Sequence, residues 1–176
     1  MISFKELNEA FDKPLEYDVD LWHKKDSLMY SFKLDDNDYY RVIIFKSQNF
    51  TKNGVYEISF EHLKNKKDIY SQHNGKMSLL NKFTTAQSIK VFSTVIAIIK
   101  EHMSDRPDIK QLAFYADSRE QSRVKLYEKL SIMAAKKLGW NVYHIPMVNF
   151  DEVDDTYGFL ISKAKVKAFQ DNHIKI

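Results

Sequence analysis

The chain has 176 residues, no cysteine and a formal net charge of +3. This length suits one domain with a sizeable core, and 44% hydrophobic with 14% aromatic residues is typical of a globular protein. The lack of cysteine excludes disulfides, thiolate metal ligands and cysteine nucleophiles, and it is compatible with a reducing compartment. No apolar run approaches about 20 residues, and the first residues lack the basic and apolar regions of a signal peptide. We therefore expect a cytoplasmic protein without a transmembrane helix.

The N-terminal half has the pattern of a short helix followed by strands. Ser3-Phe4-Lys5-Glu6 is a capping-box pattern with apolar residues after it at helical spacing, which predicts a helix over residues 4–11. Four strand-like runs separated by short polar turns then predict an antiparallel meander. These runs are Leu15–Trp22, Leu28–Leu34, Tyr39–Phe45 and Val55–Phe60. After them, Asn74-Gly75 predicts a hairpin between residues 68–72 and 76–80.

The C-terminal half alternates helices and strands. A broad apolar stripe predicts a long helix from Thr84 or Thr85 to Met103, and a second helix is predicted from Asp117 or Ser118 to Leu138, ended by Gly139. Strands are predicted at residues 109–116, 140–147 and 156–162, the last two as a hairpin, and residues 163–176 are predicted to form a terminal helix. The expected fold is a mixed α/β sheet with both long helices packed on it. The predicted core residues are Phe92, Val95, Ile96, Ile99, Leu112, Phe114, Leu126 and Leu130.

The second long helix carries the most specific motif, Leu126-Tyr127-Glu128-Lys129-Leu130. Together with the helix and strand order, this motif resembles the C-terminal half of the GNAT acyltransferase fold. The resemblance implies a GNAT-like mixed sheet, an antiparallel N-terminal meander followed by β-α-β-α-β-β, in one domain over residues 1–176. Its parts would be the meander at 1–82, a crossover half at 83–163 and a tail at 164–176. The chain departs from the family by seven extra residues, Ser131 to Lys137, before Leu138-Gly139-Trp140.

The GNAT resemblance also implies acetyl-CoA or another acyl-CoA as cofactor. In that family the first crossover helix receives the pyrophosphate on its backbone N–H groups, as free N–H groups and the helix dipole favour anions. The matching positions here are Thr85, Ala86, Gln87 and Ser88, with Lys82 or Arg123 near the phosphates. The segment contains no glycine, so the phosphate loop is degenerate. An ordinary threonine-capped helix start would explain the same residues.

Two residues are candidates for catalysis. The resemblance implies that Tyr127 would protonate the departing thiolate, although its place on the apolar stripe is equally that of a core tyrosine. A general base must reach the substrate amine, and Glu57 on the fourth strand is the candidate, with Glu61 and His62 as further ones. Charged residues on a solvent face would account for all three. The six histidines show no close pairing typical of metal ligands, so no metal is expected.

Three functions are compatible with these patterns. The first is an acyl-CoA-dependent N-acyltransferase acting on a small-molecule amine or a protein. The second is a non-catalytic GNAT-like binding module. The scarcity of Gly and Pro and the Lys-, Asn-, Asp- and Tyr-rich meander are similar to tailed-bacteriophage proteins, which predicts a virion component or host-interaction protein with a protein partner, located in the virion or the host cytoplasm. The third is a nucleic-acid-binding accessory protein that uses the basic residues of the second helix and of the tail, but interspersed acids argue against it.

Overall fold

The computed structural model describes residues 14–21, 27–36, 38–47, 54–63, 65–71, 76–77, 84–117, 121–149 and 155–164. The chain forms two compact units, one from Met1–Ile44 and Ser59–Glu101 and the other from Phe45–Ile58 and His102–Ile176. Strand β4 (Val55–Leu63) and helix α2 (Thr85–Asp105) each begin in one unit and end in the other. The predicted helix at residues 4–11 lies outside the described residues, as does most of the predicted terminal helix.

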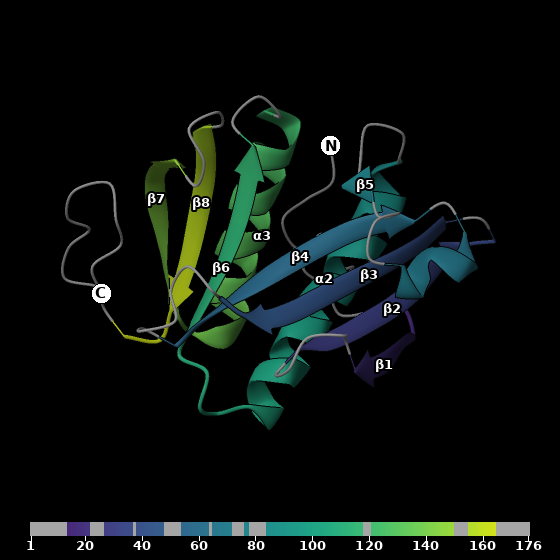
Figure 1. Ribbon diagram of the computed structural model, residues 1–176, viewed down its shortest axis with the longest axis horizontal. Helices are drawn as coiled ribbons and strands as arrows, with labels where there is room; N and C mark the ends of the chain where they lie inside the picture. Colours follow the sequence, from purple (N-terminus) through teal and green to yellow (C-terminus); the bar gives the residue numbers. More distant parts are fainter. Residues whose placement is uncertain are drawn as a thin grey trace. The chain divides into compact units, whose positions relative to one another are not determined.

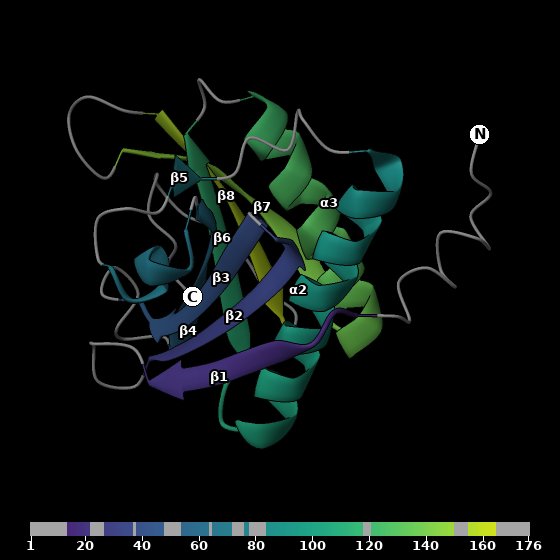
Figure 2. The same cartoon turned by 90° about the vertical axis from the view of Figure 1, so that its right-hand side faces the viewer.

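The first unit contains the predicted antiparallel meander. Its strands are hydrogen-bonded in the order β1-β2-β3-β4, with β5 beside β4. Their bounds are β1 Tyr17–Leu21, β2 Leu28–Asp35, β3 Asp38–Lys46 and β5 Lys76–Met77. Helix α2 lies along one face of these strands (Figure 2), where the Leu15 N–H donates to the Thr94 hydroxyl at 2.8 Å and the Tyr17 hydroxyl donates to the Glu101 carboxylate.

The core of the first unit is largely aromatic on that face. Tyr40 is fully buried, and its ring stacks on Phe32 at 5.2 Å and on Phe60 at 5.6 Å between centroids. Strand residues two apart point to the same face, which is why alternate aromatics on neighbouring strands meet in one layer. Of the eight predicted core residues, all but Phe92 are buried; Phe92 is half-buried, at the margin of the α2 stripe.

The predicted hairpin around Asn74-Gly75 is wrong. Residues Lys66–Tyr70 form a 3-10 helix, η2, and β5 pairs with Glu61 and His62 of β4 rather than with residues 68–72. The reason is a tertiary contact. The buried guanidinium of Arg41 donates hydrogen bonds to the backbone carbonyls of Asp68 and Ile69 in η2 and of Ser71 just after it. Carbonyls that point at one donor group require a turn rather than an extended strand.

The second unit holds the other strands and α3 (Gln121–Leu138). Strand β8 (Asp155–Ser162) runs antiparallel to both β6 (Gln111–Asp117) and β7 (Asn141–Asn149), so it lies between them (Figure 1). This confirms the predicted final hairpin. Strands β4 and β6 pair in parallel, which confirms the predicted crossover through α2. Gly139, at φ +69°, ends α3 in a left-handed conformation that lets the Trp140 N–H bond the Ala135 carbonyl at 2.8 Å.

The predicted mixed α/β class is thus confirmed. Whether the two units act as one domain over residues 1–176 stays a prediction. No helix among the described ranges is long and apolar enough to cross a membrane.

Candidate functional site

The N-terminus of α2 was the predicted phosphate site, and it is closed by its own side chains. The Gln87 N–H donates to the Thr84 hydroxyl at 3.2 Å, and the Gln87 side-chain oxygen accepts from the Thr84 N–H at 3.0 Å. This reciprocal pair is a capping box. The Ser88 N–H already donates to the Thr84 carbonyl at 3.0 Å. Two of the four predicted backbone donors are therefore used within the helix start.

An acidic side chain also lies at this helix end. The Gln87 amide nitrogen donates to the Asp35 carboxylate at 3.1 Å, across the first unit from the end of β2. A carboxylate near a helix N-terminus is favourable because it complements the positive end of the helix dipole. A pyrophosphate in the same place would be repelled by it. The residues present at Thr84 to Ser88 therefore do not fit an anionic cofactor.

Three predicted cofactor contacts cannot be placed in full. Lys82 lies outside the described residues, and for Thr85 and Arg123 only the helical backbone is described. Ala86 is exposed, and Gln87 and Ser88 are half-buried.

Glu57 lies at the end of the parallel ladder in the second unit. The pairing of β4 with β6 covers three residue pairs, Val55 with Gln111, Tyr56 with Leu112 and Glu57 with Ala113. The half-buried Glu57 carboxylate accepts a hydrogen bond from the Ser47 hydroxyl. Tyr115 follows Ala113 by two residues and shares its face. Burial, and secondly the charge of Glu57, raise the pKa of Tyr115 above its ordinary value, so this phenol stays protonated at neutral pH.

Tyr127 lies on the other side of β6. Its side chain is 2% exposed and packs against the ring of Phe114, with 5.8 Å between centroids. Phe114 and Tyr115 are consecutive strand residues, so they point to opposite faces. The two predicted catalytic residues, Glu57 and Tyr127, are therefore separated by the sheet, and the structure does not bring them together.

The other predicted bases each contact a charged side chain of the first unit. Glu61 binds Arg41 at 2.5 Å, and His62 contacts Asp38 at 2.9 Å between Nε2 and Oδ1. Sequence reasoning missed the partners of these groups. Asp38, the partner of His62, lies in one of the polar turns between the predicted strands, and nothing in the sequence marks Ser47 as the partner of Glu57.

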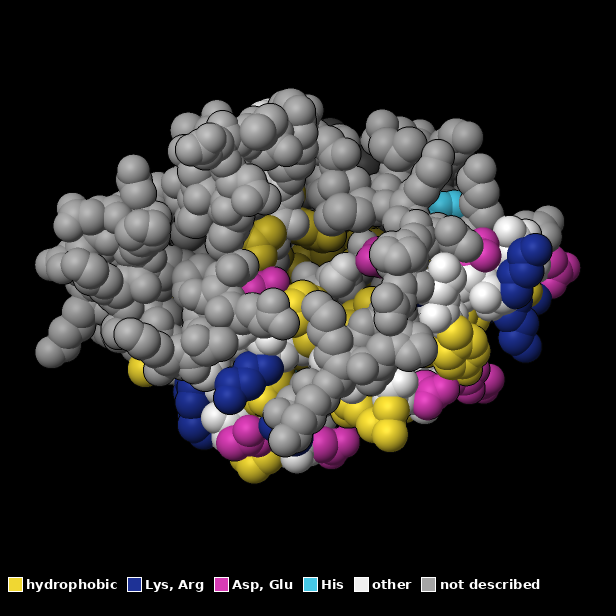
Figure 3. Space-filling model, viewed as in Figure 1, with side chains coloured by type: hydrophobic (Ala, Val, Ile, Leu, Met, Phe, Trp, Pro, Cys, Tyr) yellow, Lys and Arg dark blue, Asp and Glu magenta, His cyan; other side chains and the backbone are white. Residues whose placement is uncertain are grey.

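The basic face of α3 is exposed but balanced. Lys125, Lys129, Lys136 and Lys137 are exposed, and so is Glu128. On the face drawn in Figure 3, the coloured Lys and Arg side chains lie among Asp and Glu side chains. Within the described ranges, no group of three or more His, Asp or Glu residues is placed to hold a metal ion.

Comparison with known proteins concerns the fold. No protein-family model and no curated protein sequence matches the chain. Among solved structures, it resembles spermidine/spermine N-acetyltransferase SpeG from Vibrio cholerae, with 8% identity, TM-score 0.46, and coverage of 92% of this chain and 89% of that one. It also resembles a probable acetyltransferase from Staphylococcus epidermidis ATCC 12228, with 12% identity, TM-score 0.40, and coverage of 81% and 71%.

A third similar structure is the CoA-dependent acyl-homoserine lactone synthase MesI, with 10% identity, TM-score 0.37, and coverage of 82% of this chain and 66% of that one. At such identities and scores the likeness does not extend to activity, substrate or cofactor.

Proposed function

We propose that this protein is a GNAT-like binding module that does not use acyl-CoA at the start of α2. The observation that carries the proposal is the closed end of this helix, where Thr84 and Gln87 cap each other and Gln87 holds the Asp35 carboxylate. A phosphate would have to displace the capping box and approach a like charge. Both costs oppose binding of an acyl-CoA pyrophosphate.

The test is a thermal-shift titration of the whole chain with acetyl-CoA. A site filled at 100 times its dissociation constant would add about 2.7 kcal/mol of stability. We expect no shift at millimolar cofactor. Asp35→Asn should keep the fold and remove the repulsive charge, so a gain of weak binding in this variant would identify the carboxylate as the barrier. A clear shift in the wild-type protein would contradict the proposal.

A second candidate function is acyl-CoA-dependent N-acyl transfer to a small-molecule amine, and one observation favours it. Glu57 is a half-buried carboxylate at the end of a strand ladder, oriented by the Ser47 hydroxyl. Such a group can accept the proton of an acceptor amine. Acyl-CoA would supply the activated acyl group. Release of free thiol from acetyl-CoA in the presence of a panel of polyamines and aminoglycosides would detect this activity.

Glu57→Gln is the matched variant for that assay. If Glu57 is the base, turnover should fall by about 10²–10⁴-fold. Turnover that survives Glu57→Gln would exclude this role. The phage context and a protein partner remain predictions from composition.

A further inference from the structure

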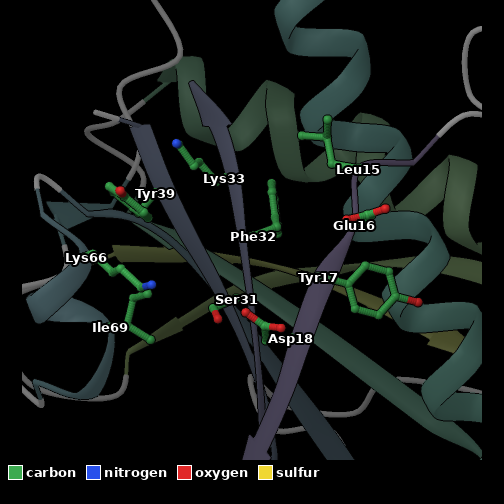
Figure 4. A pocket seen from close by; sticks show the side chains of 10 residues that line it. All are labelled: Leu15, Glu16, Tyr17, Asp18, Ser31, Phe32, Lys33, Tyr39, Lys66 and Ile69. Carbon is green, nitrogen blue, oxygen red and sulfur yellow. The ribbon is translucent and has the colours of Figure 1, made fainter. Parts of the chain in front are cut away.

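A pocket among the described residues lies in the first unit, on the sheet face opposite to α2. It has a volume of about 870 Å³ and is formed by β1, β2, β3 and η2 (Figure 4). Ligand pockets commonly measure about 300–1,000 Å³, so its size suits a small molecule. The residues used in the argument are Asp18, Ser31, Lys33, Lys66 and Ile69.

The strand register explains why polar groups gather there. Ser31 pairs with Asp18 on one side and with Arg41 on the other, so these three residues form a row across β1, β2 and β3. Arg41 donates to Glu61 and to the carbonyls of Asp68, Ile69 and Ser71. Its charge is thus neutralised, and η2 is held as one wall of the pocket. The pocket itself keeps Asp18 and Ser31 on the floor and Lys66 on the wall.

Charged side chains lie at the two sides of the pocket. Lys33 is paired with Asp36 at 2.6 Å. Neither Lys66 nor Asp18 has a hydrogen-bond or ion-pair partner within the described ranges. Glu16, just before β1, is a second acid that lines the pocket. In Figure 4 the Lys66 side chain extends from η2 toward Ser31 and Asp18. Positive charge therefore lies on the η2 side and negative charge on the β1 side.

Ser31 lines the pocket on the strand next to Asp18. Its side chain is 7% exposed, and its hydroxyl can both donate and accept a hydrogen bond. The buried side chain of Ile69 adds an apolar surface on the η2 side, beside Lys66 (Figure 4).

We propose that this pocket binds a small zwitterion, a short peptide with free termini, with its ammonium group at Asp18 and its carboxylate at Lys66. The Ser31 hydroxyl would hydrogen-bond the backbone of the peptide between its ends. A side chain of the peptide would cover Ile69. This inference names a site and a ligand class for the proposed binding function, but it does not depend on the state of the α2 N-terminus.

The probe is the tripeptide Ala-Phe-Ala, titrated into the whole chain by calorimetry at low salt. Three blocked forms are compared with it: N-acetylated, C-amidated, and both. We expect the free peptide to bind most tightly and each block to weaken binding about threefold to tenfold, as loss of a partly exposed charge contact does. The doubly blocked form should bind most weakly.

Two variants assign each end of the peptide. Lys66→Gln should abolish the preference for a free carboxylate and keep the preference for a free amine. Asp18→Asn should do the reverse. Lys67→Gln is the matched control, because Lys67 is the next residue of η2, is exposed and does not line the pocket. Ser31→Ala should weaken all four peptides alike.

Three results would each overturn the proposal. The free tripeptide could fail to bind at millimolar concentration, or all four peptides could bind equally. The third result is that Lys67→Gln and Lys66→Gln lose the preference for a free carboxylate to the same extent. Acetyl-CoA is absent from this titration, so its outcome is separate from that of the thermal-shift test. Binding of acetyl-CoA in the thermal-shift test would contradict the proposed function, but it would not affect the proposal that this pocket binds a peptide.

Discussion

Two arginines, one in each unit, form ion pairs in very different surroundings. Arg41 is 1% exposed, and it donates to the Glu61 carboxylate at 2.5 Å and to the Ile69 carbonyl at 2.9 Å. Arg106 is 34% exposed, pairs with Asp108 at 3.1 Å, and donates to the Tyr56 hydroxyl at 3.0 Å with its guanidinium over that ring. The first pair is enclosed by protein, whereas the second remains in contact with water.

The comparison shows that burial, more than bond length, sets what such a pair contributes. In water the Coulomb attraction is screened, so an exposed pair adds at most about 1 kcal/mol. In the interior the attraction is strong, but it offsets a large cost of desolvation. Removing one partner of a buried pair is therefore much more damaging than removing one partner of an exposed pair.

The largest expected effect follows from Arg41. Arg41→Met should lower the free energy of unfolding by about 3–5 kcal/mol, because Glu61 and the carbonyls of η2 lose their donor. Urea unfolding followed by circular dichroism measures it. The double variant Arg41→Met with Glu61→Leu should be more stable than the single one, since no unpaired charge is left. A loss below 1 kcal/mol in the single variant would mean that the pair is open to water.

The next effect concerns pH and the second unit. His102 is 2% exposed, and burial, with a smaller contribution from the charge of Arg106, lowers its pKa from 6.5 to about 4. The folded state therefore disfavours the protonated ring. Stability is complete above about pH 6.5 and falls as the pH drops toward 4, because the unfolded chain binds the proton more readily.

The difference between these pKa values corresponds to a loss of at most about 3 kcal/mol at 1.36 kcal/mol per unit. Urea unfolding between pH 7 and 4 measures the loss, and the ring proton shifts of His102 give its pKa directly. His102→Gln should flatten this part of the pH profile. An unchanged profile in that variant would place the pH dependence elsewhere. The charges of Asp105 and Asp108 act against this lowering of the pKa.

A smaller effect is expected at Tyr127. Tyr127→Phe keeps the ring that packs on Phe114 and removes only the hydroxyl, so the free energy of unfolding should change by no more than about 1 kcal/mol. If the chain transfers acyl groups through this hydroxyl, thiol release should fall by about 10²–10⁴-fold. Tyr115→Phe, on the face of Glu57, is the matched control. If Tyr127→Phe keeps full turnover, the role of Tyr127 is structural.

The smallest effect is that of Arg106, the exposed member of the comparison. Arg106→Met should lower the free energy of unfolding by about 0.2–1 kcal/mol. The same change removes a positive charge close to His102, so the pKa of this histidine should rise toward its ordinary value. Chemical unfolding and histidine titration by NMR measure the two consequences. A loss as large as that of Arg41→Met would refute the distinction between the pairs.

Much of the fold could be predicted because it depends on local patterns. The alternation of apolar residues in Leu28–Leu34 and the helical spacing from Ile89 to Met103 each specify one element. The left-handed residue that ends α3 could be predicted because only glycine adopts this conformation without strain, and Gly139 follows the last apolar turn.

The candidate site could be predicted only in part, because it depends on which distant residues meet. The hairpin predicted at Asn74-Gly75 does not form because Arg41 binds backbone carbonyls just before it. The most distant of these carbonyls, that of Ser71, is 30 residues from Arg41 along the chain. The position of Glu57 and Tyr127 on opposite faces follows from the pairing of β4 with β6, which no local pattern encodes. The spacing of side chains along the chain specifies which of them share one face of a helix or strand. It does not specify which distant element packs against that face.

By itself, the sequence determined the two long helices, most of the strands and the cap of α2, because each rests on patterns within a few residues. Only the tertiary structure decided that Asp35 lies at the start of α2 and that Asp18, Ser31 and Lys66 share a pocket. These groups come from separate strands and turns. Their proximity is set by strand register and by the buried ion pair of Arg41, which are properties of the folded chain.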